Sequence, residues 1–152
     1  MKEFEGKKLL ILGGNPETKP LVEVANEMEI RTIVTSARST DPAKKAAWKS
    51  YDIDGMDVEK LIELAEKEEI DGVLVGVADI LVPAYCELCA ARNYPCYATH
   101  EIVEALSFKD RFKHICEKHG IKGIPEYEVS AKCTEEDFTN MVFPVMVKPV
   151  DN

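Results

Sequence analysis

Residues 7–16 read KKLLILGGNP, and they begin a pattern that the N-terminal two thirds of the chain repeat. Lys7–Leu12 is a short apolar run, which predicts a buried strand, and the Gly-Gly-Asn-Pro that follows predicts a tight turn. Apolar residues at helical spacing come next and predict a helix. Because proline is tolerated only in the first turn of a helix, Pro20 places the helix start within residues 15–19.

The same alternation of strand and helix continues to about Ala98. Further strands are predicted at Arg31–Thr35, around Ser50–Ile53, at Val73–Val77 and at Tyr94–Ala98, and helices after an Asp57 cap and over Ile80–Arg92. Ser36–Lys45 is predicted to be a polar loop in which a short helical turn can start after Asp41-Pro42. Strands that alternate with helices in this way form parallel sheets covered on both faces. We therefore expect residues 1–98 to form an α/β domain with a doubly wound, mainly parallel, Rossmann-like sheet.

The pattern changes over residues 99–152. The expected elements are helices at Thr99–Leu106 and Ser107–His119, a helical turn from Thr134, and strands at Ile124–Ser130 and Phe143–Val150. Ser107 and Asp110 match a capping box, and Gly120 suits the left-handed end of the helix. Two strands without a partner sheet cannot bury both faces, so this part is expected to be the start of an α+β domain.

Composition narrows the classes of function. The chain has 152 residues, 45% of them hydrophobic, and a net charge of −9, which argues against a nucleic-acid surface or an anionic membrane surface. No apolar run reaches the roughly 18 residues that a transmembrane helix needs. Five cysteines, an odd number, are best explained as reduced thiols in a cytoplasmic protein.

The turns after the first and fourth strands are the candidate binding site. In an open parallel sheet, ligands bind at the carboxyl ends of the strands where the strand order reverses. The glycines let a ligand approach the backbone, and the start of the helix that follows offers N–H groups to an anion. The candidate substrate-binding residues are Gly13, Gly14, Asn15, Thr18, Gly76 and Asp79. The alternative is that these glycines serve only the turns.

Other known motifs are absent or incomplete. No GxGxxG dinucleotide fingerprint is present, although Arg38 after the second strand keeps an NADP-binding alternative open. Cys86 and Cys89 have CxxC spacing, but they fall inside a helix, without the second ligand pair of a zinc site or the helix-start position of a redox pair. We interpret them as ordinary core or surface thiols.

Two lysines in the C-terminal part are candidate phosphate contacts. Lys109 lies in the first turn of a predicted helix, where a cation opposes the helix dipole, and Lys113 shares its face. The alternative for this pair is a solvated helix face. Lys148 lies inside the apolar Phe143–Val150 segment, where a buried charge needs an anionic partner.

Together, these parts resemble the ATP-grasp superfamily. The matching features are an α/β domain, a helix with Lys109, a Gly120-Ile and Pro125-Glu-Tyr segment, and Phe143-Pro-Val-Met-Val-Lys-Pro149. The order of these segments is similar to that in biotin carboxylase and carbamoyl-phosphate synthetase. The resemblance spans the chain, but only about ten positions carry it.

The resemblance implies an ATP-dependent ligase. Residues 1–98 correspond to the pre-ATP-grasp domain, which presents the substrate, and residues 99–152 to the start of the first ATP-grasp subdomain. Such enzymes use ATP and Mg²⁺ to activate a carboxylate or bicarbonate as an acyl phosphate, which an amine or ammonia then attacks. Lys109 and Lys148 would bind the nucleotide phosphates, whose charge must be neutralised in a partly dry site.

The departures from this pattern also carry expectations. The glycine-rich flap, the adenine-binding hinge and the metal ligands of the superfamily do not occur before Asn152. We therefore expect the N-terminal portion of a longer enzyme, inactive alone, with the rest of the ATP-grasp domain supplied in cis or in trans. The alternative is a non-catalytic Rossmann-like binding or interaction module, in which residues 130–152 dock onto a partner or a second copy.

Overall fold

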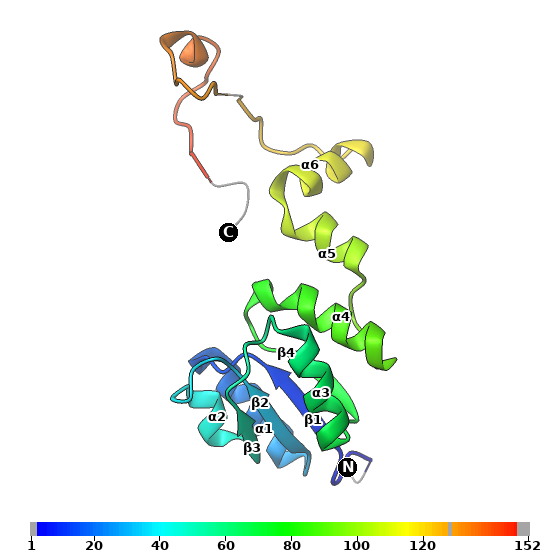
Figure 1. Ribbon diagram of the computed structural model, residues 1–152. Coiled ribbons are helices and arrows are strands. Elements are labelled where there is room, and N and C mark those ends of the chain that lie inside the picture. The colour runs from blue at the N-terminus through cyan, green and yellow to red at the C-terminus, as the bar shows by residue number, and fades with distance from the viewer. Residues whose placement is uncertain (1–2, 128, 149–152) are drawn as a thin grey trace. The chain divides into compact units, whose positions relative to one another are not determined.

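The computed structural model describes residues 3–127 and 129–148 (Figure 1). The chain divides into two compact units, Met1–Val103 and Glu104–Asn152. The first unit contains a four-stranded sheet in the order β3-β2-β1-β4, and every strand pair in it is parallel. The strands are β1 (Lys8–Leu12), β2 (Arg31–Thr35), β3 (Lys49–Tyr51) and β4 (Gly72–Val75). The predicted α/β class is confirmed.

Helices connect these strands and cover both faces of the sheet (Figure 1). They are η1 (Pro16–Thr18), α1 (Lys19–Glu27), α2 (Pro42–Ala46), α3 (Val58–Glu68), η2 (Asp79–Leu81) and α4 (Val82–Arg92). Pro20 lies in the first turn of α1, as predicted. The Asp57 side chain caps α3 by accepting a hydrogen bond from the Lys60 N–H group, at 3.2 Å.

Successive residues of β1 point to opposite faces of the sheet and enter two separate cores. Leu10 and Leu12 pack with the residues of α3 and α4, among them Leu61 and Leu88. Ile11 packs on the other face with residues of β2, α1 and α2. Helices on both faces of one parallel sheet make the unit doubly wound, as the sequence predicted.

The fifth strand predicted at Tyr94–Ala98 is wrong, because the backbone donors of this segment are used elsewhere. The Tyr94 N–H group bonds the Cys89 carbonyl at the end of α4, at 2.9 Å. The Tyr97 N–H group donates to the Tyr85 hydroxyl, at 3.1 Å, and Pro95 has no N–H group. A strand would need these donors for its ladder.

The C-terminal part is helical and irregular. Its elements are α5 (His100–Ser107), α6 (Lys109–Lys118) and the short η3 (Glu135–Phe138). The capping box predicted at Ser107 is wrong, since Ser107 still belongs to α5 and Phe108 precedes α6. A capping box forms instead between Thr134 and Asp137 at η3. The predicted left-handed Gly120 is confirmed, with φ of 71°.

The two strands predicted in this part are not formed by the described residues. In Ile124–Ser130 no strand is assigned at the positions that the structure describes, and Glu128 lies outside them. Residues 143–148 are also irregular, while residues 149 and 150 of the predicted strand lie outside the described range. A strand needs a neighbour for its hydrogen bonds, and the described residues after Val103 include no other strand.

Among the helices that the structure describes, none is both long enough and apolar enough to cross a membrane.

Candidate substrate-binding edge of the sheet

The carboxyl ends of β1 and β4 lie side by side. β1 pairs with β2 on one side and with β4 on the other, so the winding direction reverses between β1 and β4. The turn that begins at Gly13 and the turn that begins at Gly76 therefore leave the sheet at neighbouring positions. This is the place where open parallel sheets bind ligands, and its strand arrangement agrees with the sequence expectation.

The first turn bends sharply away from β1. Gly13 has a φ of 95°, a left-handed conformation that favours glycine, and its N–H group bonds the Thr35 carbonyl at 2.9 Å. Gly14 packs closely on Asp41, since a Cβ at Gly14 would lie 2.8 Å from the Asp41 Cβ. The Gly14 carbonyl accepts a bond from the Ala43 N–H group, at 3.1 Å, which joins the turn to α2.

The structure brings Asn15, Thr18 and Gly76 together. Thr18 is fully buried, and its hydroxyl donates to the Asn15 carboxamide oxygen. A Cβ at Gly76 would lie only 2.2 Å from the Thr18 Oγ1, so the two turns touch at this point. The Gly76 N–H group also bonds the Leu12 carbonyl, at 2.8 Å. These contacts hold the Asn15 carboxamide, whose NH₂ group is a hydrogen-bond donor.

Asp79 supplies an exposed carboxylate after β4. It is the first residue of η2, and two residues later the Leu81 side chain packs beneath the turns. A Cβ at Gly13 would lie 3.3 Å from the Leu81 Cδ1, and one at Gly55 would lie 2.9 Å from the Leu81 Cδ2. Leu81 therefore anchors the loop that carries Asp79 against the first turn.

A buried lysine at this edge was not foreseen from the sequence. Lys44 is only 6% exposed, and its ammonium group pairs with Asp52 and donates to the Ser36 carbonyl at 3.1 Å. It thereby links the segments that follow β2 and β3. The sequence around it reads as a polar loop, and only the fold brings Asp52 to it. The sequence feature that could have indicated this position was the helix start at Asp41-Pro42, which places Lys44 on α2.

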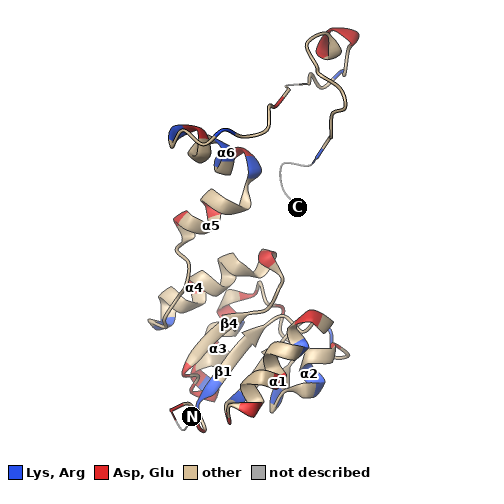
Figure 2. Ribbon diagram, turned by 180° about the vertical axis from the view of Figure 1, so that it is seen from behind, with Lys and Arg blue, Asp and Glu red and all other residues tan. Residues whose placement is uncertain are grey.

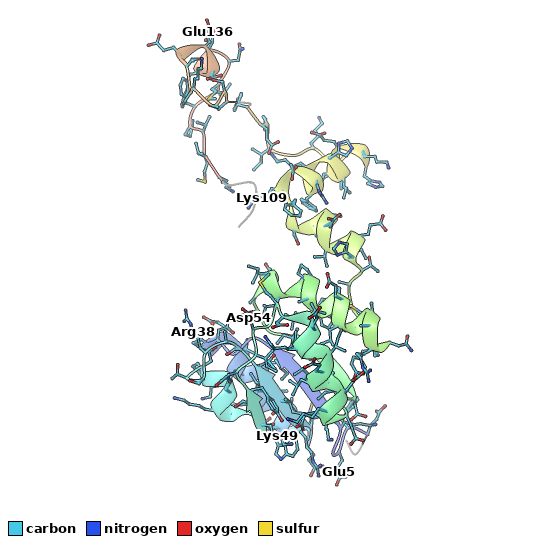
Figure 3. All side chains as sticks on the ribbon, in the orientation of Figure 1. Glu5, Arg38, Lys49, Asp54, Lys109 and Glu136 are labelled. Atoms are coloured by element: carbon cyan, nitrogen blue, oxygen red, sulfur yellow. The ribbon has the colours of Figure 1, made fainter. Side chains whose placement is uncertain are left out.

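Figure 3 labels residues at both edges of the sheet. Arg38 and Asp54 lie toward the carboxyl edge, while Lys49 and Glu5 lie at the opposite edge. Arg38 is exposed in the loop after β2. In Figure 2 α1 carries both basic and acidic residues, whereas the charged residues of α2 are the basic Lys44 and Lys45. The edge thus combines glycine turns, the Asn15 amide, exposed carboxylates that include Asp79 and Asp54, and the buried Lys44 ammonium group.

The candidate phosphate-binding lysines lie in the second unit. Lys109 is the first residue of α6 and is exposed. Lys113 bonds the Ile124 carbonyl at 3.2 Å and pairs with Glu126, so its ammonium group already has partners in this unit. Lys148 is exposed, which makes the predicted burial of this lysine wrong. Its neighbour Val147 is 94% exposed.

Two further observations define the limits of the site. Within the described part of the chain, no group of three or more His, Cys, Asp or Glu side chains is arranged to hold a metal ion. A shallow hollow of about 190 Å³ lies beside α3, and its lining residues are Tyr51, Ile53, Lys60, Glu63, Leu64 and Lys67. None of the candidate residues lines this hollow, which therefore lies apart from the candidate edge.

Comparison with known proteins shows which sequences this chain is similar to. No model of a known protein family matches the chain. The chain is 34% identical over 77 residues to a formate-dependent phosphoribosylglycinamide formyltransferase of Bacillus velezensis, covering 51% of this chain and 20% of the relative. The corresponding protein of Methanocaldococcus jannaschii is 27% identical over 146 residues, covering 94% of this chain and 37% of the relative.

Solved structures of other enzymes also match the fold of this chain. N5-carboxyaminoimidazole ribonucleotide synthetase from Thermotoga maritima matches 91% of this chain and 37% of its own, with a TM-score of 0.67 and 25% identity. The chain has the N-terminal fold of ATP-grasp ligases. The ATP-grasp relatives include an L-amino acid ligase from Bacillus licheniformis, whose TM-score of 0.77 at 17% identity shows the shared fold. The chain spans less than two fifths of the length of these relatives.

Proposed function

We propose that this chain is the substrate-presenting part of an ATP-dependent ligase that activates a carboxylate. The observation that carries the proposal is the contact of the Gly13 and Gly76 turns, through Thr18, at the switch point of the sheet. Relatives with this fold are ATP-dependent ligases, which supports the general class.

The candidate edge suits a small anionic substrate. The turn after β1 leads directly into η1 and α1, and helix starts favour negative charge because their N–H groups lack partners in the helix. Asn15 adds an amide donor, and the Asp79 carboxylate is suited to bind an amine or a hydroxyl group. The names of the relatives include phosphoribosylglycinamide and a ribonucleotide, each a phosphorylated compound with a nitrogen group. We propose the same substrate class here.

In this proposal the ligase forms an acyl phosphate from a carboxylate or bicarbonate, and an amine or ammonia attacks it, as in carbamoyl-phosphate-synthetase-like enzymes. ATP and Mg²⁺ would be needed for that step. Lys109 and Lys148 would neutralise nucleotide phosphates. The other parts of an ATP-grasp domain would complete the nucleotide site, in the same chain or in a partner.

Isothermal titration tests the substrate half of the proposal. The probes are phosphoribosylglycinamide, ribose 5-phosphate and formate, each titrated into the wild-type chain. We expect the phosphorylated probes to bind, and Asn15→Ala and Asp79→Ala each to weaken phosphoribosylglycinamide by about tenfold, or roughly 1.4 kcal/mol. Glu5→Ala removes an exposed carboxylate at the opposite edge and should leave the affinity unchanged.

The outcomes separate the alternatives. Binding that Glu5→Ala weakens as much as Asp79→Ala would place the ligand away from the candidate edge. Absence of binding by every probe would favour a non-catalytic interaction module. The two lysines are tested in the complete enzyme, with Mg-ATP titrated into the wild type and into the Lys109→Ala and Lys148→Ala variants; an affinity that neither variant weakens would remove them from the nucleotide site.

A further inference from the structure

Three thiols converge beside α4, of which only Cys86 and Cys89 are paired by their spacing in the sequence. Cys86 and Cys89 are one helical turn apart on α4 and are buried, being 7% and 1% exposed. Cys96 comes from the irregular segment after the helix and is exposed. Its sulfur atom lies 3.8 Å from that of Cys86. All five cysteines of the chain are free.

The segment that carries Cys96 is held against α4 on both sides of the thiol, and before it the Tyr94 N–H group bonds the Cys89 carbonyl at 2.9 Å. The Tyr97 ring stacks on the Tyr85 ring with centroids 4.7 Å apart, and the Tyr97 N–H group bonds the Tyr85 hydroxyl. Cys96 itself bonds the Ala98 carbonyl, at 2.8 Å. The Cys86 sulfur lies 3.5 Å from the same Ala98 carbonyl, so the fold keeps Cys86 beside Cys96.

The three thiols differ in how readily they lose a proton. Burial raises the pKa of Cys86 to about 11 and that of Cys89 to about 12. Burial acts in the same direction on Cys96, but hydrogen bonds with the Ala98 backbone, Tyr85 and the two other thiols outweigh it and lower the pKa of Cys96. The exposed thiol is thus the one that is most readily ionised, and the thiolate is the attacking form in disulfide exchange.

We propose that Cys86 and Cys96 form a reversible disulfide, with Cys96 as the attacking thiol and a low-molecular-weight disulfide as the oxidant. The distance between the sulfur atoms must shorten from 3.8 Å to about 2.05 Å. Cys96 lies outside any helix or strand, so this shift breaks no helical or ladder hydrogen bond. Cys89 stays reduced and buried in the core.

The exchange balances with oxidised glutathione. The Cys96 thiolate attacks one glutathione sulfur, forming a mixed disulfide and releasing one glutathione thiolate. The Cys86 sulfur then attacks the Cys96 sulfur and displaces the second glutathione, which takes up the Cys86 proton. The two cysteines lose two electrons, and one glutathione disulfide becomes two glutathione molecules.

Peptide mapping of the wild-type chain after treatment with oxidised glutathione tests this assignment. Trypsin cuts after Arg92 and separates Cys96 from the cysteines of α4, and a glutamate-specific protease cuts after Glu87, between Cys86 and Cys89. We expect a linked peptide pair that contains Cys86 and Cys96 and that dithiothreitol separates. Cys133, which is exposed in the other unit, reports the reaction of an ordinary surface thiol.

Matched variants give the decisive comparison. Cys86→Ser should abolish the link and leave Cys96 stably glutathionylated, whereas Cys89→Ser should form the link as the wild type does. A wild-type chain in which Cys96 keeps its glutathione, a link that joins Cys89, or a Cys96 that reacts no faster than Cys133 would each overturn the proposal.

Discussion

In the first unit Leu10, Leu12 and Leu88 are fully buried, whereas in the second unit Val147 is 94% exposed and Met146 is 79% exposed. No described residue between 104 and 148 is buried. The sequences of the two regions are similarly apolar in places, so hydrophobicity alone does not account for the difference. The first unit packs its own helices against both faces of its own sheet, so the apolar side chains between these layers are covered. An apolar segment stabilises a unit only when the same unit also supplies the helix or sheet that packs against that segment.

The largest expected effect comes from a core residue. Leu88→Ala should lower the free energy of unfolding of the first unit by about 2–5 kcal/mol, because it leaves a cavity in a fully buried site. Val147→Ala removes an exposed side chain and should change stability by no more than about 0.5 kcal/mol. Urea unfolding followed by far-ultraviolet circular dichroism measures both. Similar losses in the two variants would mean that Val147 is covered in solution.

A glycine pair sharpens the comparison. Gly76→Ala places a Cβ 2.2 Å from the buried Thr18 hydroxyl and should cost about 1–3 kcal/mol through overpacking. Gly123→Ala in the second unit meets nothing within 4 Å and is the matched control. Thermal unfolding checks the pair. If Gly76→Ala were as stable as the control, the two turns would not be in contact.

Glu68 provides a test by pH. It is 6% exposed, and hydrogen bonds from Lys49 (2.8 Å) and then from the Tyr51 hydroxyl (2.5 Å) lower its pKa. A lowered pKa gives stability that is present above the unfolded-state value near 4.5 and is lost as the pH falls through the folded-state value. Glu68→Gln should cost about 1–3 kcal/mol at pH 7 and flatten the acid limb of the stability curve.

The measurement for this prediction is urea unfolding at a series of pH values between neutral and acid. The Lys49→Met variant is a second test, since it removes one hydrogen-bond partner of Glu68 and keeps the Glu68 carboxylate. An acid limb that is unchanged in Glu68→Gln would show that other carboxylates determine it.

The smallest effect is expected at Asp137 in the second unit. Hydrogen bonds from the Ser130 side chain, then from the Ser130 and Thr134 N–H groups, lower its pKa. The group is exposed, so Asp137→Ala should leave global unfolding unchanged and speed hydrogen exchange at the Ser130 and Thr134 amides. In the wild type the same protection should be lost as the pH falls through the lowered pKa. Protection that persists in the variant would argue against this local role.

The repeating part of the sequence predicted its structure well because each segment contained its own signals. Pro20 and Asp57 fixed helix starts, and the run at residues 7–12 fixed the central strand. The Tyr94–Ala98 segment has strand-like side chains, but its backbone donors bond α4, a competition that no local pattern reveals.

The residues of the candidate site were likewise only partly predictable from the sequence. The sequence identified the turns at Gly13 and Gly76, since glycine after a strand is a local signal. It gave no indication of the Lys44–Asp52 pair or of Cys96 beside Cys86, because each of these depends on how the loops fold back. The phosphate-binding roles of Lys109 and Lys148 stay predictions.

Trp48 gives the first unit an optical label of its own. It is the single tryptophan of the chain, 46% exposed, and its ring lies near the Arg31 guanidinium and the Lys49 ammonium group, at 5.4 Å and 4.7 Å from the ring centroid. Cations held over an indole ring alter its emission, and unfolding removes them. Intrinsic fluorescence excited at the tryptophan band therefore follows the melting of the sheet unit without any contribution from the residues beyond Val103.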